Sequence, residues 1–248
     1  MDWKLTKSIF LAAFIVINLV LIYMIYNESN EEVSRLSKQS DVLSKTNIDT
    51  SVLEDYESRE MQMIVGEPAD IKTEDANSAD DSTNNQTTVP IDEDVAFTRG
   101  GLEEFKNNSV YKGEAYHYDE VMSESDAVVF NQMYEDYPIF SNELARLYFS
   151  EEPMTMSQGY IESIKPSDYS VKQTVRNPNV IIEELYMNED ITGNAVIESA
   201  KLGYYIILEE NNQVMMRPKW QFEITDGDIE RILYVDALSQ TEDIIERE

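Results

Sequence analysis

Few residues of this chain have the types and spacing that catalysis requires. The sequence contains one histidine, His117, and no cysteine. A serine hydrolase would have to use His117 as its general base, and no Gly-x-Ser-x-Gly turn is present to hold a nucleophile. The lack of cysteine excludes disulfides and thiolate metal sites, and a single histidine excludes a multi-histidine metal site. Because His117 lies between Tyr116 and Tyr118, we predict a half-buried structural residue on a strand.

Carboxylates dominate the charged residues. The chain has 49 Asp and Glu residues against 19 Lys and Arg residues, which gives a formal net charge of −30. This charge argues against nucleic-acid binding, which needs clustered Lys and Arg. The sequence has no EF-hand loop and no glycine-rich phosphate-binding loop. We therefore predict a protein that is not an enzyme and uses no metal or cofactor. A wall hydrolase with two catalytic carboxylates stays open, because spacing alone cannot identify such a pair among so many acids.

An apolar stretch near the N-terminus predicts a membrane anchor. Residues 9–26 read IFLAAFIVINLVLIYMIY and contain no charge. As a helix they would extend over about 27 Å, close to the hydrocarbon thickness of a bilayer. Lys4 and Lys7 precede the stretch and acidic residues follow it. The positive-inside rule therefore places residues 1–8 in the cytoplasm and the C-terminal part outside the cell. No small-residue cleavage site follows, which favours a single-pass anchor in the cell membrane over a cleaved signal peptide.

One polar residue, Asn18, interrupts the predicted anchor. Lipid tails cannot solvate its amide, so the side chain would favour a hydrogen bond to another helix, worth roughly 0.6–2 kcal/mol. Ser8 and Ala12 form a small-xxx-small pair on a nearby face. We name Ser8, Ala12, Ile15 and Asn18 as candidate contacts with a partner helix. The alternative, that a single-pass anchor merely tolerates one asparagine, stays open.

The remaining residues divide by composition into a polar stretch and a region that can build a core. Residues 27–97 are predicted to form a juxtamembrane segment and an acidic linker. Between Gly66 and Asp94 the chain has nine acids, one lysine and almost nothing to bury. Ordering such a stretch would cost about 1–2 kcal/mol per residue without compensating burial, so we expect a flexible linker or long loop. Residues 98–170 and 171–248 differ, because they contain short apolar runs separated by turn residues.

Each of these two regions reads as a helix followed by strands. In the first, a short helix at Gly101–Phe105 precedes predicted strands at 114–118, 127–134, 139–140, 144–149 and 156–164. In the second, a helix with Pro178 at its first position precedes predicted strands at 196–208, 214–224 and 229–237, with a turn at Asn211-Asn212 between the first two. We predict an α+β fold: a single N-terminal transmembrane helix followed by an extracellular domain of two tandem units, each an antiparallel sheet plus a helix.

Aromatic residues in the second region are candidates for ligand binding. Tyr204, Tyr205 and Trp220 can form an aromatic surface for a wall or peptide ligand, although such residues more often pack across strands. Gly203 interrupts the same strand-like run, which indicates a bulge or close packing. An extracellular binding module is therefore an alternative function.

Three sequence blocks resemble one protein family. The first ten residues, MDWKLTKSIF, are similar to the N-terminus of the YycI (WalI) membrane regulatory proteins of low-GC Gram-positive bacteria. Phe130–Tyr134 followed by Pro138–Phe140 resembles that family's F-x-Q-x-Y and PIF block. Leu202–Tyr205 followed by Arg217–Trp220 resembles its LGYY and P-x-W block. The order and spacing of the blocks are more specific than any one of them, and residues 28–97 carry no part of the resemblance.

This resemblance implies regulation rather than catalysis. YycI proteins lie in the cell membrane beside a similar single-span protein, YycH. Together they modulate the WalK (YycG) sensor histidine kinase, whose pathway controls cell-wall metabolism. The resemblance also implies a tandem α+β external part and brings no catalytic residues. We therefore expect an accessory protein of this two-component system whose partners are the lipid bilayer, a YycH-like protein and WalK.

Overall fold

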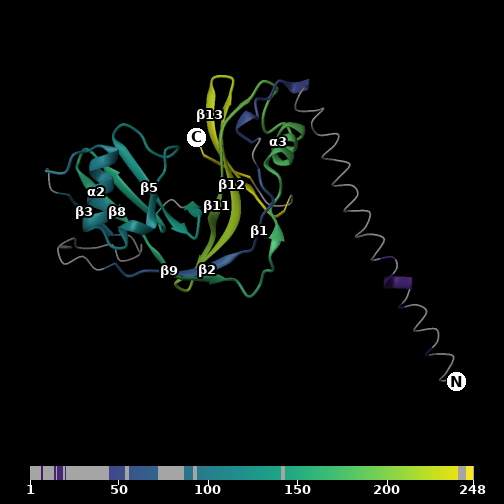
Figure 1. Ribbon diagram of the computed structural model, residues 1–248, viewed down its shortest axis with the longest axis horizontal. Helices are drawn as coiled ribbons and strands as arrows, with labels where there is room; N and C mark the ends of the chain where they lie inside the picture. Colours follow the sequence, from purple (N-terminus) through teal and green to yellow (C-terminus); the bar gives the residue numbers. More distant parts are fainter. Residues whose placement is uncertain are drawn as a thin grey trace. The chain divides into compact units, whose positions relative to one another are not determined.

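The computed structural model of the protein describes Lys7, Phe14, residues 16–18, Val20 and the ranges 45–53, 56–71, 87–91, 94–140, 143–239 and 244–247. Most of the regular structure in these residues is β-strand, with few helices, so the α+β class is confirmed (Figure 1). The chain forms two compact units. The first combines Met1–Asp49 with Asn179–Ala195, and the second combines Thr50–Pro178 with Val196–Glu248.

The first unit contains nearly all of helix α3 (Pro178–Met187). The helix begins at Pro178, as predicted, because proline has a suitable φ for the first helical position and its missing N–H is not needed there. It ends in a Schellman motif, in which Glu189 takes a φ of 66° and the Asp190 N–H donates to the Leu185 carbonyl at 2.9 Å. Its fully buried side chains are Ile181, Ile182 and Leu185.

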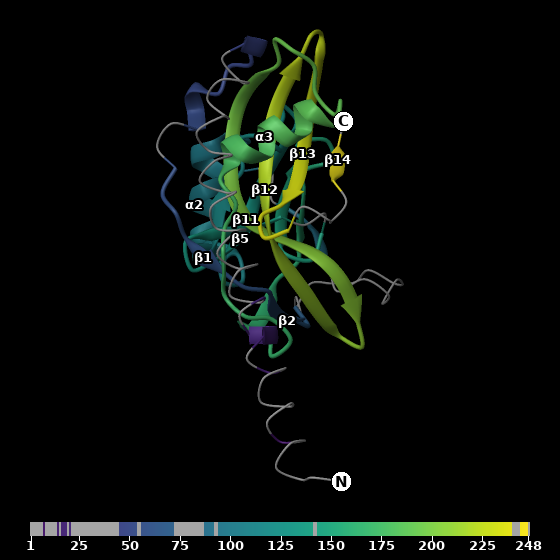
Figure 2. The same ribbon diagram turned by 90° about the vertical axis from the view of Figure 1, so that its right-hand side faces the viewer.

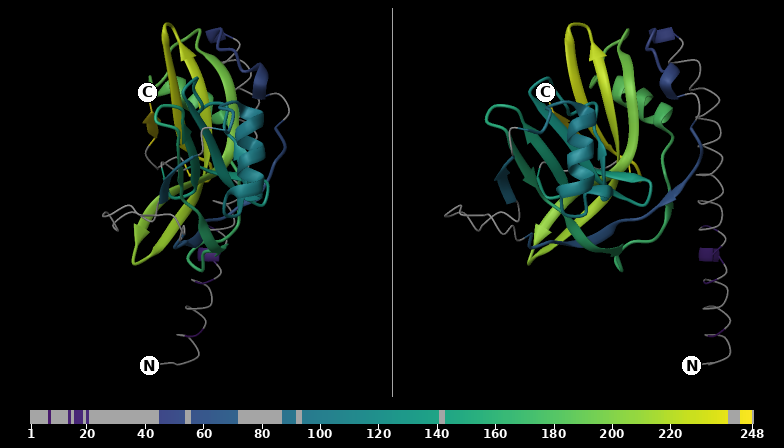
Figure 3. Two further views of the ribbon diagram at one scale, coloured as in Figure 1. Left: turned by 90° about the vertical axis from the view of Figure 1, so that its left-hand side faces the viewer. Right: turned by 60° about the vertical axis from the view of Figure 1, so that its left-hand side comes forward.

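In the second unit, helix α2 (Arg99–Ser109) packs on a set of antiparallel strands, β4 (Tyr116–Tyr118), β5 (Ala127–Tyr134), β7 (Arg146–Ser150) and β8 (Thr155–Gln158) (Figure 3). The Thr98 hydroxyl caps the helix by accepting a hydrogen bond from the Gly101 N–H at 3.2 Å. Between helix and strands, Leu102 packs in one cluster with Phe130 and Phe149, whose rings meet edge to face at 5.9 Å. These contacts bury the apolar side of a short helix that would not be stable alone.

Three long strands form the other half of the second unit: β11 (Val196–Glu210), β12 (Gln213–Asp226) and β13 (Ile229–Asp236), with β14 (Ile245–Arg247) beside β13 (Figure 2). The turn between β11 and β12 is the predicted Asn211-Asn212 pair. Both residues have positive φ, 51° and 60°, which suits a two-residue hairpin turn and which asparagine tolerates better than most residues.

Strand β6 (Tyr137–Phe140) connects the two halves of this sheet. It pairs antiparallel with β5 and parallel with β11, so the strands follow the order β14-β13-β12-β11-β6-β5-β7-β8-β3. Gly203 of β11 lies at this junction, where an added Cβ would lie 2.5 Å from both Phe140 Cε2 and Pro138 O. Of the two predicted reasons for a glycine at position 203, a bulge or close packing, close packing is therefore confirmed.

Parts of the stretch expected to be a flexible linker are strands. Strand β2 (Ile64–Pro68) pairs with β9 (Ile161–Pro166) on one side and with β12 on the other. Strand β3 (Thr87–Pro90) pairs with β8. Composition concealed these strands because their hydrogen-bonded partner strands lie far away in the sequence, although Ile64 of β2 is fully buried. Gly66 is buried, and a Cβ there would collide with Ile161 Cγ2, so this glycine allows close packing.

Most predicted strands after residue 98 are confirmed, with shifted ends. Strand β5 has the predicted bounds, and β11, β12 and β13 match within two residues at each end. The predicted strand 156–164 is divided into β8 and β9, since Gly159 approaches the Glu143 and Leu144 backbones too closely for any Cβ. Two helical turns, η1 (Ser51–Leu53) and η2 (Gly113–Ala115), and the short pair β1 (Glu60–Met61) with β10 (Gln173–Thr174) complete the described elements.

Candidate interaction site

A cavity of about 240 Å³ opens in the second unit beside the β11–β12 hairpin. Four segments line it: the η1 turn and the residues after it, the start of β6, the first residue of α3, and one face of the hairpin. Its lining residues are Val52, Leu53, Tyr56, Glu57, Arg59, Asp136, Tyr137, Pro178, Ala200, Leu202 and Trp220. We call this feature the Trp220 cavity.

Aromatic rings form one wall of the Trp220 cavity. Tyr56 meets Trp220 edge to face, with ring centroids 5.7 Å apart. Trp220 in turn stacks on Phe222 at 6.0 Å, with an angle of 20° between the ring planes. Leu202 lies opposite Trp220 in the β11–β12 register, so both side chains are on the same face of the hairpin. The wall is therefore continuous with the packed face of the sheet.

Hydrogen bonds to one backbone segment hold both aromatic residues in place. The Tyr56 hydroxyl donates to the Val175 carbonyl at 2.9 Å, and the Trp220 indole Nε1 donates to the Arg176 carbonyl at 3.1 Å. The β1–β10 pair continues into this segment, because the Val175 N–H donates to the Arg59 carbonyl at 2.8 Å. Satisfying the polar atom of each ring lets its apolar surface be buried without an unpaired donor.

Charged residues surround the opening of the Trp220 cavity. Glu57, Arg59 and Asp136 are exposed, while Trp220 is only 6% exposed. Burial raises the pKa of the Tyr56 hydroxyl above its usual value, with a smaller opposing effect from Arg59. Tyr56 therefore stays neutral and serves as a hydrogen-bond donor rather than as a charged group. Buried aromatic and aliphatic side chains beside charged border residues are the arrangement found at the centre of protein–protein contacts.

The size of the Trp220 cavity defines what it can accept. Engineered apolar cavities of about 150 Å³ bind benzene, so 240 Å³ has room for one aromatic or branched aliphatic side chain. Its described lining contains no histidine and combines aromatic and aliphatic side chains with the charged residues Glu57, Arg59 and Asp136. This arrangement can bind an apolar anchor residue of another chain.

The three aromatic residues predicted to form a surface do not form one together. Trp220 and Tyr204 are buried, 6% and 5% exposed, and only Tyr205 is half-buried. The Tyr204 ring packs edge to face against Tyr134 at 5.9 Å and Tyr137 at 6.2 Å, and Tyr205 packs against Tyr234 at 5.0 Å. The expectation of an exposed aromatic surface is corrected accordingly: Tyr204 and Tyr205 pack against neighbouring rings, and Trp220 is buried and lines the Trp220 cavity.

The predicted helix contacts fall largely outside the described residues. Ser8, Ala12 and Ile15 lie outside them, as does most of the predicted anchor at residues 9–26. Asn18 is described and helical, and its amide nitrogen donates to the Phe14 carbonyl at 2.8 Å. An asparagine amide has two N–H donors and one acceptor, so this bond occupies one donor only. The role of Asn18 in helix pairing stays a prediction.

Among the residues that the structure describes, no helix is both long and apolar enough to cross a membrane.

His117 lies on a strand, as predicted, but its side chain is exposed rather than half-buried. It is opposite Asn131 in the β4–β5 register. The alternation of β4 explains the exposure, since Tyr116 occupies the buried face and its neighbour must point the other way. Within the described ranges, no cluster of three or more His, Asp or Glu side chains could hold a metal ion.

Sequence reasoning missed the residues around Trp220. Tyr56 lies in an acidic, non-periodic segment and contributes to the cavity only through its contacts with Trp220 and Val175, far away in sequence. Tyr137 was visible only as the residue before the Pro138–Phe140 block. Neither position carries a local pattern that reveals a cavity, because the cavity is formed by segments that lie far apart in the sequence.

Comparisons with known proteins identify a family. The family model described as YycI protein matches residues 26–238, which is most of the chain. A search of curated proteins found no match. Among solved structures, the chain is similar to an uncharacterized protein from Eubacterium rectale ATCC 33656, with a TM-score of 0.31 and 11% sequence identity. That similarity covers 52% of this chain and 45% of the other, so this chain spans under half the length of that protein.

Proposed function

Since this chain belongs to the YycI family, we propose that it is a membrane-anchored accessory regulator of a sensor histidine kinase in a two-component system that controls cell-wall metabolism. The family is associated with regulation of the WalK two-component system and is a regulatory rather than an enzymatic family. The match over residues 26–238 is the observation that carries this proposal. The proposed partners are a YycH-like single-pass protein and the kinase WalK (YycG).

The proposed location follows from the sequence. The uncharged stretch at residues 9–26 would be the single membrane span, with residues 1–8 in the cytoplasm and the strand-rich part outside the cell. We propose that the chain's influence on a kinase passes through the span or through the external face, and a coupling of about 1–3 kcal/mol would change kinase output 5–150-fold.

The order of the elements in the proposed external part indicates where a partner protein can bind. The order of helix then antiparallel strands occurs twice, with α2 before β4–β8 and α3 before β11–β13. We propose that residues 98–170 and 171–248 are tandem units. The surface between the two repeats would then lie near β6 and β11. The Trp220 cavity adjoins that junction through Tyr137 and Leu202. An apolar anchor residue from a partner can enter it, while the net charge of −30 keeps the domain away from anionic wall polymers.

The Trp220 cavity also favours a second candidate function, an external binding module for a wall or peptide ligand. The cavity has the aromatic wall and small volume of a site for one side chain or sugar substituent. This candidate differs from the first in the nature of the occupant, which would be a free ligand rather than a membrane protein.

Photo-crosslinking in living cells tests the proposal. A photoreactive amino acid would replace Glu57 at the cavity border in the full chain, and a matched control would carry it at Glu104, an exposed position on α2. We expect position 57 to capture the kinase or the YycH-like protein and position 104 to capture neither. Capture of a peptide or glycan would replace the first candidate with the second. Loss of all adducts in cells whose kinase remains regulated would contradict both.

A further inference from the structure

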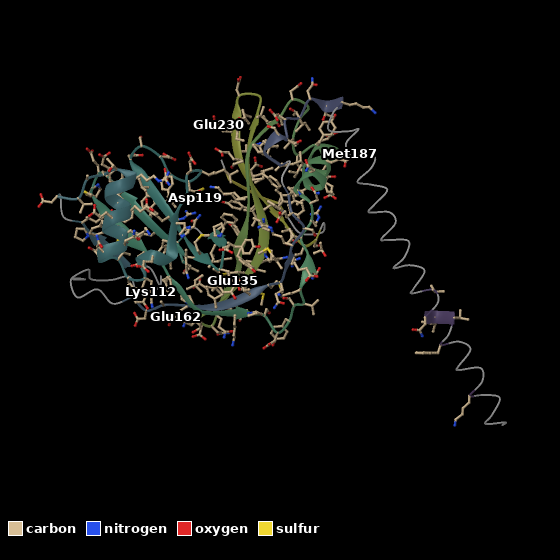
Figure 4. All side chains as sticks on the ribbon, viewed as in Figure 1. Lys112, Asp119, Glu135, Glu162, Met187 and Glu230 are labelled. Atoms are coloured by element: carbon tan, nitrogen blue, oxygen red, sulfur yellow. The ribbon has the colours of Figure 1, made fainter. Side chains whose placement is uncertain are left out.

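A second concavity lies in the second unit, between the end of β5 and the start of β9. It has a volume of about 400 Å³ and is separate from the Trp220 cavity. Figure 4 labels three of its charged residues, Lys112, Glu135 and Glu162, which come from three segments of the chain. The remaining lining residues are Tyr111, Gln132, Met133, Tyr134, Tyr160, Ile161, Ser163 and Ile164. We call this feature the tyrosine groove.

A buried glutamine fixes the base of the tyrosine groove. Gln132 is 1% exposed, and its side-chain Nε2 donates to the Ile161 carbonyl at 2.6 Å. Its Oε1 accepts from the Ile161 N–H at 2.8 Å. The side-chain amide of Gln132 thus forms the two hydrogen bonds to the Ile161 backbone that a neighbouring strand would otherwise form. These bonds hold β5 and β9 side by side. The groove is therefore a built feature with a fixed width.

Tyrosine rings form the walls of the groove. Tyr111 and Tyr160 meet edge to face with centroids 5.6 Å apart, and Tyr160 also contacts the buried Tyr116 at 6.0 Å. Tyr111 is 45% exposed, so part of its face is open to a ligand. On the other wall, Tyr134 is held edge to face by Tyr204 at 5.9 Å. Rings fixed by neighbours lose little entropy when a ligand stacks on them.

Carboxylates give the groove a negative potential. Glu135 and Glu162 are both exposed at its border. Burial is the main cause of the raised pKa of Tyr160, and Tyr111 and Glu162 raise it further. Burial likewise raises the pKa of Tyr134, and Glu135 adds to the effect. Each carboxylate thus raises the pKa of a tyrosine that lines the groove. A cation in the groove would experience the same negative potential.

One cation of the chain already borders the groove. The Lys112 ammonium lies 6.0 Å from the centroid of the Tyr111 ring, at the end of the range for a cation–π contact. The groove thus has two carboxylates against one ammonium among its described lining. Tyrosine faces and carboxylates together favour a cation that can stack and form paired hydrogen bonds, which a guanidinium does better than an ammonium.

We propose that the tyrosine groove binds an arginine side chain from a basic segment of a partner protein. The guanidinium plane stacks on the open face of Tyr111, and its N–H groups donate to Glu135 and Glu162. The net charge of −30 attracts basic segments from a distance, and the groove selects the side chain that fits. The assignment of this segment to a signalling partner rests on the proposed function. The chemistry of the groove is independent of that proposal.

Titration calorimetry with the full chain in detergent micelles tests this assignment. The probe is an acetylated and amidated peptide of three arginines separated by glycines, and the control peptide carries citrulline, a neutral analogue of the same shape, in place of each arginine. We expect the arginine peptide to bind at least tenfold more tightly than the citrulline peptide. Equal affinity of the two peptides, or no binding of the arginine peptide, overturns the proposal.

Paired variants separate the groove from the general charge of the protein. Glu135→Gln with Glu162→Gln should weaken arginine-peptide binding about fivefold, as expected for two exposed ion pairs. Glu104→Gln with Glu120→Gln removes the same charge from exposed positions that do not line the groove and should change affinity less than twofold. Lys112→Gln should strengthen binding about two- to threefold, because it removes a competing cation. An equal loss in both double variants contradicts the proposal, as does weaker binding by Lys112→Gln.

The peptide titration and the crosslinking experiment fail independently. The titration uses purified chain without a kinase, so a negative result rejects the groove and leaves the regulatory proposal standing. Absence of kinase crosslinks together with tight arginine-peptide binding rejects the regulatory proposal and leaves the groove as a site for basic segments.

Discussion

Gly203 on β11 lies directly against Phe140 on β6, and a Cβ added to Gly203 would be only 2.5 Å from Phe140 Cε2. The same Cβ would lie 2.5 Å from the Pro138 carbonyl oxygen. The two strands pair in parallel, with Tyr204 opposite Ile139 and Tyr205 opposite Phe140. Two of the sequence blocks that resemble the YycI family, Pro138–Phe140 and Leu202–Tyr205, therefore meet at one junction, and the absence of a side chain at Gly203 permits their contact.

Gly203→Ala should destabilise the second unit. The added methyl must displace either the Phe140 ring or the β6 backbone, and overpacking of this kind costs about 1–3 kcal/mol. The free energy of unfolding, measured by urea denaturation of the full chain in detergent, checks this expectation.

Gly100→Ala is the matched control for that substitution. Gly100 lies in α2, and a Cβ there would meet nothing within 4 Å. Alanine should leave stability unchanged or raise it by about 0.5–1 kcal/mol, since glycine is unfavourable inside a helix. Equal effects of the two substitutions on the free energy of unfolding would show that the contact with Phe140 does not restrict the size of the side chain at position 203.

The elements with local signals were predictable from the sequence, and the elements held by distant partners were not. Alternating apolar residues predicted β5 with the correct bounds, and Asn211-Asn212 predicted the hairpin turn. Strand β2 was missed because Gly66 and Glu67 carry no strand signal, and its pairing with β9 and β12 depends on residues more than ninety positions away. Gly203 was recognised as a bulge or a site of close packing, but nothing local indicated that β6 was its neighbour.

Tyr116→Phe should change the response of stability to alkaline pH. Burial raises the pKa of the Tyr116 hydroxyl above its usual value of about 10, although a hydrogen bond from Gln158 opposes the shift. The unfolded chain therefore loses this proton first. The stabilising contribution is complete below pH 10 and is lost as pH rises from there towards the folded-state pKa.

The Tyr116→Phe variant removes this pH-dependent contribution to stability and also removes one hydrogen-bond donor. The hydroxyl donates to the Gly159 carbonyl at 2.7 Å, so the variant should lose about 1–2 kcal/mol at neutral pH. Its stability should then fall less steeply than that of the unmodified chain above pH 10. Urea denaturation at a series of pH values measures both effects, and identical slopes for the two proteins would contradict the role of Tyr116.

Ala200→Phe should block the Trp220 cavity without unfolding the protein. Ala200 lines the cavity on the same face of the hairpin as Leu202 and Trp220, so a phenyl ring at this position can enter the existing space. We expect the free energy of unfolding to change by less than the roughly 1–3 kcal/mol that overpacking costs where no cavity is available. Capture of the kinase or the YycH-like protein from position 57 should fall at least tenfold.

Glu120→Phe provides the control for the added ring, because Glu120 is exposed and does not line the cavity. Capture from position 57 should be unchanged in this variant. If Ala200→Phe also leaves capture unchanged while the protein stays folded, the cavity is not the contact site.

Asn18→Leu should weaken association within the membrane. The amide donates one hydrogen bond to Phe14 of its own helix and retains a second N–H and a carbonyl oxygen for a partner helix. Loss of such interhelical bonds costs roughly 0.6–2 kcal/mol, so co-purification with a partner should fall about threefold to thirtyfold. Val20→Leu, a conservative change in the same helix, should have no effect. Unaltered co-purification and kinase output in Asn18→Leu would remove Asn18 from the contact.

Prediction of the candidate site from sequence was limited by tertiary structure. Trp220 was named as a possible surface residue, yet it is only 6% exposed and lines a cavity. Tyr56 and Arg59 were overlooked because they lie in an acidic segment that resembles a linker, and the β1–β10 pair orders this segment through residues 173–175. An isolated aromatic residue in a polar segment gives no indication of the ring that it will contact.

Reconstitution of the full-length kinase in proteoliposomes tests the regulatory role most directly. Kinase phosphorylation would be measured alone, with the full chain, and with the full chain together with the YycH-like protein. We predict a change of at least fivefold, in either direction, when the chain and its partner are present. Phosphorylation that stays the same in all three preparations, with all proteins shown to be inserted and folded, would contradict regulation of the kinase by this chain.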